Sequence, residues 1–341
     1  MRTRSWLVPR RLRSRSLVPC DGSDRHVRTS MRDRVGVPLR GIIATPVTPL
    51  TEDGAVDQFT HERLVRFLVA NGAHGIAVPT HMGESLGLSL DERLMLAQRT
   101  VACVDGLVPV VVHVSATDRR DVIRLSTNAE RIGASGVLVH PPYHSRLTVP
   151  ALEDYFTSIL SVLNIPVYGY NSRLEGGYTL PGDLVASLAN TWDHFRGIKD
   201  ISGSIDYLTE VCAFAARADR EFSVLAGGEH LVAVMSLGGH GSFAGAFAIV
   251  PRMVRTLYEA CLQQNLAVAR PLQYKLGSLL RVLSVHYPAR YKIALEIMGR
   301  PTGRLRLEVG GDYQSERSIV EGVLHEIGAM DTEPLGWSAP E

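Results

Sequence analysis

Lys199 is the residue of this chain whose type and position point most clearly to chemistry. It is one of only three lysines among 341 residues, and it follows Phe195, Gly197 and Ile198 in the strand-like stretch 195–200. Burial disfavours a charged ammonium, so a lysine inside such a strand is expected to have a lowered pKa and to supply the neutral amine of a Schiff-base nucleophile. A salt bridge to Asp200, or a place just outside the strand end, is the alternative. Lys275 and Lys292 lie in amphipathic helical patterns, and we expect both to be solvated.

Tyr170 is the second candidate for catalysis, because it ends the apolar stretch that precedes the one with Lys199. Adjacent strands lie ~4.8 Å apart, so a phenol in this place could reach a substrate held on the lysine. There it could move protons among carbinolamine, imine and enamine, which is general acid–base work. Packing with the hydroxyl in water is the alternative.

Four further polar residues permit a different hypothesis, a metal site. His81, His140, His144 and Glu84 follow strand-like stretches and could hold the ion of a metal-dependent aldolase. They would have to converge from two loops, and no His-x-His or His-x-x-x-His spacing supports the site.

The elements that must position these residues alternate between short β-branched runs and longer helical patterns. Eight continuous apolar runs are typical of parallel strands covered on both faces. We predict an α/β fold, a closed (β/α)₈ TIM barrel, with reactive groups after the carboxyl ends of its strands. A doubly wound sheet would usually bring a Gly-rich loop after its first strand, where this chain has Pro46-Val47-Thr48-Pro49. The expected strands are Gly41–Thr45, His74–Val78, Val108–Val114, Gly136–His140, Pro166–Asn171, Phe195–Asp200, Phe222–Ala226 and Gly241–Gly245.

The domain organisation follows from the same patterns. The barrel is expected over residues 38–264, and a small C-terminal helical appendix over 265–330, with a tail at 331–341. Helices are predicted near 251–263, 265–285, 287–299 and 313–328. Ser89-Leu90-Asp91-Glu92 is a capping-box pattern that predicts a helix start. Residues 1–37 are expected to be a disordered Arg/Ser-rich extension, and an organelle-targeting peptide is the alternative.

Charge and composition exclude several classes of protein. Residues 1–40 carry 11 Arg and 3 Asp, which leaves 25 basic and 32 acidic side chains for the rest of the chain. A mildly acidic body is a poor nucleic-acid binder, because that affinity begins with phosphate neutralisation. No stretch approaches the roughly 18 apolar residues of a membrane span. The four cysteines are widely spaced, as in a cytoplasmic protein with reduced thiols. Because the body is acidic and no apolar span is present, we expect no nucleic-acid or membrane partner.

The motifs together resemble the dihydrodipicolinate synthase / N-acetylneuraminate lyase family of Schiff-base lyases. The matching stretches, from about residue 38 to 328, are GIIATPVTPLTEDGAVD, MGESLGLSLDER, HPPYHSR, VYGYN, GIKDISGSIDYL, VLAGGEHL, LGGHGSFAG and YPARYKIALEIMG. The resemblance implies a TIM barrel, a homotetramer built as a dimer of dimers, and an imine between Lys199 and a 2-oxo acid, commonly pyruvate. Tyr170 matches the catalytic tyrosine. No cofactor and no metal are implied beyond the covalent imine.

The resemblance also implies a substrate site. The family's carboxylate-binding loop falls on residues 80–84, without its two hydroxyl side chains at positions 81 and 82. Its proton relay of Tyr, Thr and Tyr falls on Tyr170, His81 and His144, and the loop of His144 lies at a subunit contact in the family. The implied substrate-binding residues are Thr80, Met82, Gly83, Glu84, Asn171, Arg173, Glu175, Gly227 and Ala244.

One departure from the family bears on the substrate. Glu175 stands where the family usually has an Arg that binds the second substrate's carboxylate, and Arg173 is the nearest basic residue. The resulting hypothesis is a lyase acting on pyruvate or a 2-oxo-3-deoxy acid, by aldol cleavage, condensation or dehydration. An authentic 4-hydroxy-tetrahydrodipicolinate synthase, a non-catalytic 2-oxo acid binding protein and a metal-dependent aldolase are the alternatives.

Overall fold

The eight predicted strands form a closed parallel barrel in which each strand pairs with its neighbours in sequence and β8 pairs with β1. The computed structural model describes residues 38–143, 146–172, 179–308 and 310–338, so the predicted extension at 1–37 lies outside it. All eight strands lie within the predicted ranges except that β7 begins and ends one residue later. Their bounds are β1 Gly41–Ala44, β2 Gly75–Val78, β3 Val110–His113, β4 Gly136–Val139, β5 Val167–Asn171, β6 Phe195–Asp200, β7 Ser223–Gly227 and β8 Gly241–Ala244.

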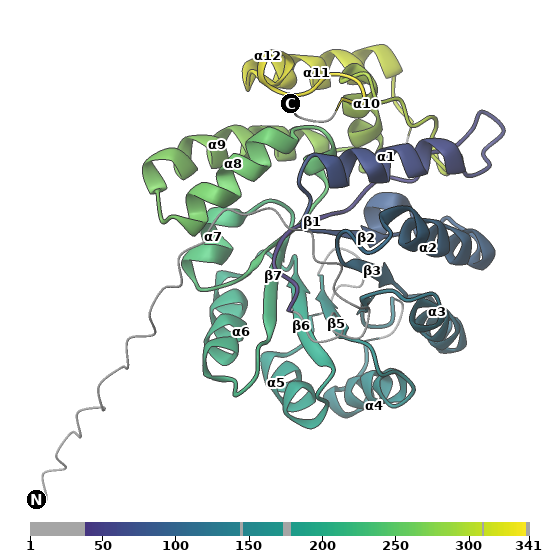
Figure 1. Ribbon diagram of the computed structural model, residues 1–341, viewed down its shortest axis with the longest axis vertical. Coiled ribbons are helices and arrows are strands. Elements are labelled where there is room, and N and C mark those ends of the chain that lie inside the picture. The colour runs from purple at the N-terminus through teal and green to yellow at the C-terminus, as the bar shows by residue number, and fades with distance from the viewer. Residues whose placement is uncertain (1–37, 144–145, 173–178, 309, 339–341) are drawn as a thin grey trace, which may run out of the picture.

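Helices surround the barrel and cover its outer surface (Figure 1). Local signals set their ends: Ser89 forms the expected capping box with Glu92 at the start of α2, and Asn71 caps the end of α1 ahead of a left-handed Gly72. The helices that follow the strands are α1 Gln58–Ala70, α2 Leu90–Val104, α3 Arg119–Arg131, α4 Val149–Leu160, α5 Gly182–Thr191, α6 Ile205–Arg217, α7 Leu231–Ser236 and α8 Pro251–Leu262.

The predicted helical appendix is also present. It packs beside α8 and α1 at one side of the barrel (Figure 1). Its helices are α9 Leu266–Leu283, α10 Ala289–Ile297, α11 Tyr313–Glu326 and α12 Ala329–Thr332. The buried guanidinium of Arg300 ties it down by donating to the carbonyls of Ala248 (3.2 Å), Ile249 (3.1 Å) and Pro334 (2.7 Å). Within the described ranges, no helix has the length and apolarity to cross a membrane.

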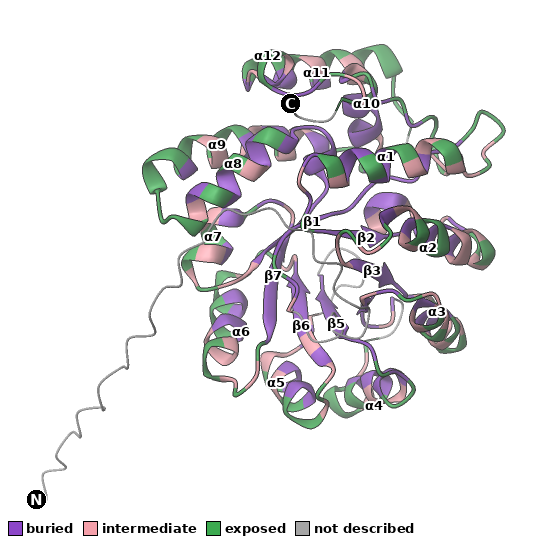
Figure 2. Ribbon diagram, viewed as in Figure 1, coloured by how far each residue is buried: buried purple, intermediate pink, exposed green. Residues whose placement is uncertain are grey.

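The barrel strands are buried on both faces, as their continuous apolar sequences require (Figure 2). Side chains of alternate residues point to opposite faces. One set meets the helices, and the other fills the barrel. The filling consists of Leu39, Ile43, Ala77, Val111, Leu138, Tyr168, Tyr170, Leu225 and Phe243. The alternation that sends Tyr168 and Tyr170 inward also sends Lys199 inward, because Tyr170 and Lys199 are register partners on β5 and β6.

Candidate active site

Lys199 lies inside the barrel near the carboxyl end of β6, with only 6% of its surface exposed. Its Nζ is 3.9 Å from the centroid of the Tyr170 ring and 5.2 Å from that of Phe243. Glycine at 227 leaves room for the lysine, since a Cβ there would lie 3.2 Å from Lys199 Cε. Asp200 points the other way, to Asn171 and Ser202, as alternation along a strand requires. The amine thus faces the ring of the predicted catalytic tyrosine.

A chain of hydrogen bonds leads away from the Tyr170 hydroxyl. That hydroxyl is 3.2 Å from His81 Nδ1, and His81 Nε2 is 2.8 Å from the hydroxyl of Tyr143. The structure therefore brings His81 to Tyr170, as the predicted relay requires. The third predicted relay residue, His144, lies outside the described residues. Its neighbour Tyr143, which sequence analysis did not name as a site residue, reaches the relay from the same chain.

Two further histidines line this end of the barrel. The ring of His113, the last residue of β3, lies 4.9 Å from the His81 ring, centroid to centroid, and 5.9 Å from that of Tyr170. The ring of His140 stacks on Tyr143 at 4.9 Å and meets Tyr170 edge-on at 5.2 Å. Both histidines are completely buried. His113 is not among the site residues predicted from the sequence, although its place two residues after the inward-facing Val111 could have revealed it.

Burial and nearby positive charges keep His113 neutral. Desolvation lowers its pKa well below the usual value, and His81, Arg93 and Lys199 act in the same direction. Arg93 is itself buried, with a pKa lowered to about 10 by desolvation, and it donates to the backbone carbonyls of His113 (2.8 Å) and Ser115 (2.9 Å). These bonds hold the end of β3, and hence the His113 ring, in place.

The loop after β2 is built as a tight turn. Residues His81–Gly83 form one turn of 3₁₀ helix, and Thr48 Oγ1 donates to Gly83 O at 2.7 Å. The amides of Gly83 and Glu84 bond to Thr80 O and His81 O within the turn, each at 2.9 Å. These two amides are therefore engaged within the turn, and the expected role of the loop in binding a substrate carboxylate stays a prediction.

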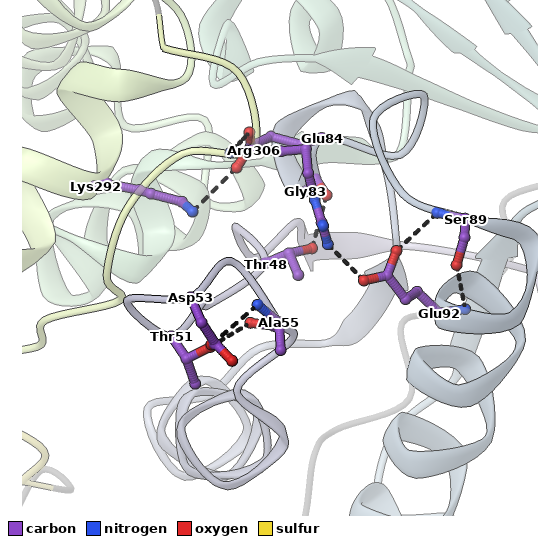
Figure 3. A network of polar contacts seen from close by, with 10 residues as sticks. All are labelled: Thr48, Thr51, Asp53, Ala55, Gly83, Glu84, Ser89, Glu92, Lys292 and Arg306. Atoms are coloured by element: carbon purple, nitrogen blue, oxygen red, sulfur yellow. Dashed lines mark hydrogen bonds and ion pairs between the residues drawn. The ribbon is translucent and has the colours of Figure 1, made fainter.

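The side chain of Glu84 anchors this loop to the helical appendix (Figure 3). Its carboxylate lies 3.0 Å from Lys292 Nζ and accepts a hydrogen bond from Arg306 N at 2.7 Å. The prediction that Lys292 is solvated is wrong: it is 5% exposed and also donates to Arg304 O. Lys292 lies on the buried face of α10, where its ammonium pairs with the Glu84 carboxylate. The helical pattern of the sequence does not show which face of the helix is covered. Lys275 is exposed, as predicted.

Other predicted site residues occupy varied places. Asn171 is buried, donates to Asp200 Oδ1 at 2.7 Å and accepts from Leu180 N at 2.8 Å. The nitrogen and the oxygen of its side-chain amide are therefore both hydrogen-bonded to protein groups. Thr80 and Ala244 are buried at the carboxyl ends of β2 and β8. The methyl group of Met82 fills the space that a side chain at Gly245 would need. Arg173 and Glu175 lie outside the described residues.

Glu229 is a buried carboxyl group in the segment between β7 and α7. It is completely buried, and its Oε1 accepts a 2.6 Å hydrogen bond from Ala246 N. Burial raises its pKa to about 7, although the Ala246 amide and the charge of Lys199 act in the opposite direction. Glu229 therefore titrates near neutrality, next to the backbone that follows β8.

Of the four residues named for a metal site, His144 lies outside the described residues, and the other three have partners among the surrounding side chains. Glu84 is engaged by Lys292, and the rings of His81 and His140 lie 5.9 Å apart, with Tyr143 and Tyr170 packed against both. In the described part of the chain, no group of three or more His, Cys, Asp or Glu side chains is placed to hold a metal ion.

Known proteins resemble this chain in sequence and in fold. Residues 38–326 match the Dihydrodipicolinate synthetase family. A 4-hydroxy-tetrahydrodipicolinate synthase of Methanosphaerula palustris is 32% identical over 273 residues, which cover 79% of this chain and 92% of the relative. The dihydrodipicolinate synthase structure from Thermotoga maritima has a TM-score of 0.81 and 29% identity, covering 85% of this chain and 99% of that one. A prophage protein of the same family from E. coli K12, solved with pyruvate, has a TM-score of 0.80 and 28% identity, covering 85% and 98%.

Proposed function

The chain belongs to the dihydrodipicolinate synthetase family and is a lyase of the class I aldolase type, and we propose that Lys199 is its imine-forming residue. The substrate that we propose is pyruvate or a 2-oxo-3-deoxy acid. One observation carries the proposal: a buried lysine amine lies 3.9 Å from the ring of a tyrosine whose hydroxyl begins a hydrogen-bonded chain through His81. An amine in this place needs a proton shuttle beside it, and Tyr170 supplies one.

The proposed reaction begins when the neutral amine of Lys199 attacks the C2 carbonyl of the 2-oxo acid. The first adduct carries a positive charge on nitrogen and a negative charge on oxygen, and one proton moves from that nitrogen to that oxygen. A second proton, taken up from solvent, lets the resulting hydroxyl leave as water while the C=N bond forms, so the imine is left protonated. Tyr170 is placed to carry both protons, with His81 as its partner. The protonated imine then acts as an electron sink for the pair that is left at C3.

The bond broken next decides the reaction class. Cleavage of C3–C4 in a 4-hydroxy-2-oxo acid gives an aldehyde and the enamine of pyruvate, whereas loss of a proton from C3 followed by loss of the C4 hydroxyl is a dehydration. Imidazoles and phenols at this end of the barrel suit a substrate rich in hydroxyl groups, because each can donate or accept a hydrogen bond. We therefore propose a 2-oxo-3-deoxy sugar acid as the longer substrate.

The test is reductive trapping. The protein is incubated with pyruvate and borohydride, and the modified peptide is located by mass mapping. We expect one adduct, on Lys199, and none in the Lys199→Arg variant. Lys275→Arg is the matched control, since Lys275 is exposed and should leave trapping unchanged. Absence of an adduct with pyruvate and with other 2-oxo acids would overturn the proposal.

A second candidate is the reaction of the relatives, 4-hydroxy-tetrahydrodipicolinate synthesis. It is favoured by the curated relative at 32% identity, which carries that name. The two candidates share the imine and differ in the second substrate. Formation of 4-hydroxy-tetrahydrodipicolinate from pyruvate and the amino-aldehyde partner would support the synthase, whereas turnover of 2-oxo-3-deoxy acids alone would support the first candidate.

Two properties of the whole protein complete the proposal. We propose a homotetramer, as the family resemblance implies, and native mass measurement tests it. We also propose a cytoplasmic location, which the free thiols of Cys103, Cys212 and Cys261 support, since reduced cysteines are typical of reducing compartments.

A chelator should leave the activity unchanged, and inactivation that added metal reverses would instead favour the metal-dependent aldolase.

A further inference from the structure

The hydrogen-bonded chain from Tyr170 does not end at Tyr143. The Tyr143 hydroxyl also lies 3.5 Å from Nε2 of His113, besides the 2.8 Å contact with His81. On its other side, His113 Nδ1 lies 3.2 Å from the backbone carbonyl of Pro79. Four side chains, Tyr170, His81, Tyr143 and His113, therefore form one line that leads from the lysine to the backbone of the loop after β2.

The tautomer of His113 follows from its partners. A carbonyl oxygen only accepts hydrogen bonds, so Nδ1 must carry the proton that it donates to Pro79 O. The ring is neutral, because the groups that face it are cationic or neutral and burial lowers its pKa well below the usual value. Nε2 therefore presents a lone pair to Tyr143. The groups around the ring are His81, Arg93, Lys199, His140, Tyr143 and Tyr170.

The hydroxyl proton of Tyr143 is within reach of His81 Nε2 and of His113 Nε2. The nitrogen that accepts this proton determines the tautomer of His81. If Tyr143 donates to His113, the contact with His81 needs the proton of His81 Nε2, and His81 Nδ1 then offers a lone pair to the Tyr170 hydroxyl. If Tyr143 donates to His81 Nε2 instead, a neutral His81 carries its proton on Nδ1 and donates it to Tyr170. The same four residues thus have two directions of hydrogen bonding.

We propose that His113 is a positioning residue that accepts the Tyr143 proton and thereby holds His81 in the tautomer that lets Tyr170 act as a base. The inference rests on the proposed function, because it assigns a role within imine formation on Lys199. In the first direction Tyr170 donates to His81, and its oxygen acts as the acceptor of the proton on the substrate nitrogen.

The proton balance of the step is complete. Tyr170 takes the proton from nitrogen of the tetrahedral adduct and passes its own proton to His81 Nδ1, so that His81 becomes an imidazolium. The proton then returns through Tyr170 to the adduct oxygen, which becomes the hydroxyl of a neutral carbinolamine, and His81 is neutral again. A second proton, taken up from solvent, lets that hydroxyl leave as water and leaves the imine protonated. Tyr143 and His113 exchange no proton in this cycle. They fix the orientation, as the buried aspartate does for the histidine of a serine protease.

The test measures the rate of imine trapping with pyruvate in single and double variants. We expect His113→Leu to slow trapping by about 100-fold, in the range of a general acid–base contribution. The pyruvate concentration for half-maximal trapping should stay unchanged, because His113 does not touch the substrate. His113→Gln keeps an acceptor for Tyr143 and should recover most of the rate. Tyr143→Phe should be slow, and adding His113→Leu to it should slow trapping no further, since both act through one hydrogen bond.

His61→Leu is the matched control. His61 is another completely buried histidine, bonded to Thr100 between α1 and α2, and it takes no part in this chain. If His61→Leu slows trapping as much as His113→Leu, or if the two losses at 113 and 143 add, the inference is wrong. If the unaltered protein traps pyruvate on Lys199 and His113→Leu traps it equally fast, only the inference fails. If the unaltered protein forms no adduct with any 2-oxo acid, the proposed function fails, and the inference with it.

Discussion

Glu84 and Lys292 form a buried ion pair, 3.0 Å apart, that joins the loop after β2 to helix α10 of the appendix. The loop carries His81 and the helix lies more than 200 residues further along the chain, so the appendix helps to hold the active site. Burial lowers the pKa of Lys292, and the carboxylate of Glu84 raises it in opposition. The Glu84 carboxylate therefore helps Lys292 to keep its charge in this buried place.

Removal of one partner of this pair should destabilise the protein strongly. Lys292→Met leaves Glu84 as a buried charge without its cation, and breaking such a pair costs about 3–5 kcal/mol of unfolding free energy. Denaturant unfolding of Lys292→Met, Glu84→Gln and the double variant tests this, and the double variant should be more stable than Lys292→Met. As a control, loss of the exposed Arg66–Glu62 pair should cost less than about 1 kcal/mol. Equal effects of the two pairs would contradict the prediction.

Glu229 should make stability depend on pH. Its pKa in the folded protein is about 7, above the usual 4.5. A carboxyl group with a raised pKa contributes stability that is fully present below the unfolded value and is lost as the pH rises through the folded value. The folded protein should therefore lose up to roughly 3 kcal/mol between pH 4.5 and pH 7 through this group.

The measurement is a comparison of unfolding free energies at pH 5 and pH 8. Glu229→Gln cannot titrate, so its stability should change less between the two pH values than that of the unaltered protein. An equal change in both proteins would show that Glu229 is not responsible.

Gly227 should be required for the position of Lys199. A Cβ at this place would lie 2.6 Å from Ile201 Cβ and 3.2 Å from Lys199 Cε, so Gly227→Ala must displace the lysine or its neighbour. We expect slower imine trapping by about tenfold or more, since small misplacements of a reacting group have large effects on rate. Gly322→Ala on α11 is the control, because nothing lies within 4 Å of its added Cβ. Unchanged trapping in Gly227→Ala would contradict the prediction, because it would show that Ile201 shifts without displacing Lys199.

Lys199→Ala separates an imine-forming enzyme from a binding protein. Binding to the folded state raises the melting temperature by mass action, and a covalent imine adds to that stabilisation. Pyruvate should therefore raise the Tm of the unaltered protein and raise that of Lys199→Ala much less. An equal rise in both would favour the non-catalytic 2-oxo acid binding protein.

The barrel was predictable because its signals are local. Each strand is a short continuous apolar run, and caps such as Ser89 with Glu92 mark helix starts within four residues. Alternation along β5 and β6 also determines that Tyr170 and Lys199 face inward together. Lys292 shows the limit of such reasoning: its helical pattern is that of a surface helix, and only the loop packed on α10 buries its ammonium.

The amino-acid sequence by itself determined the fold, the family and the lysine–tyrosine pair, because strand spacing and side-chain alternation are properties of a chain read in order. Only the tertiary structure decided how the relay continues. Tyr143 and His113 come from separate βα units, and their contact depends on the parallel pairing of β3 with β4 and of β4 with β5, which brings the ends of these strands together beside Tyr170. The burial that keeps His113 neutral and raises the pKa of Glu229 likewise exists only when all eight strands enclose the site.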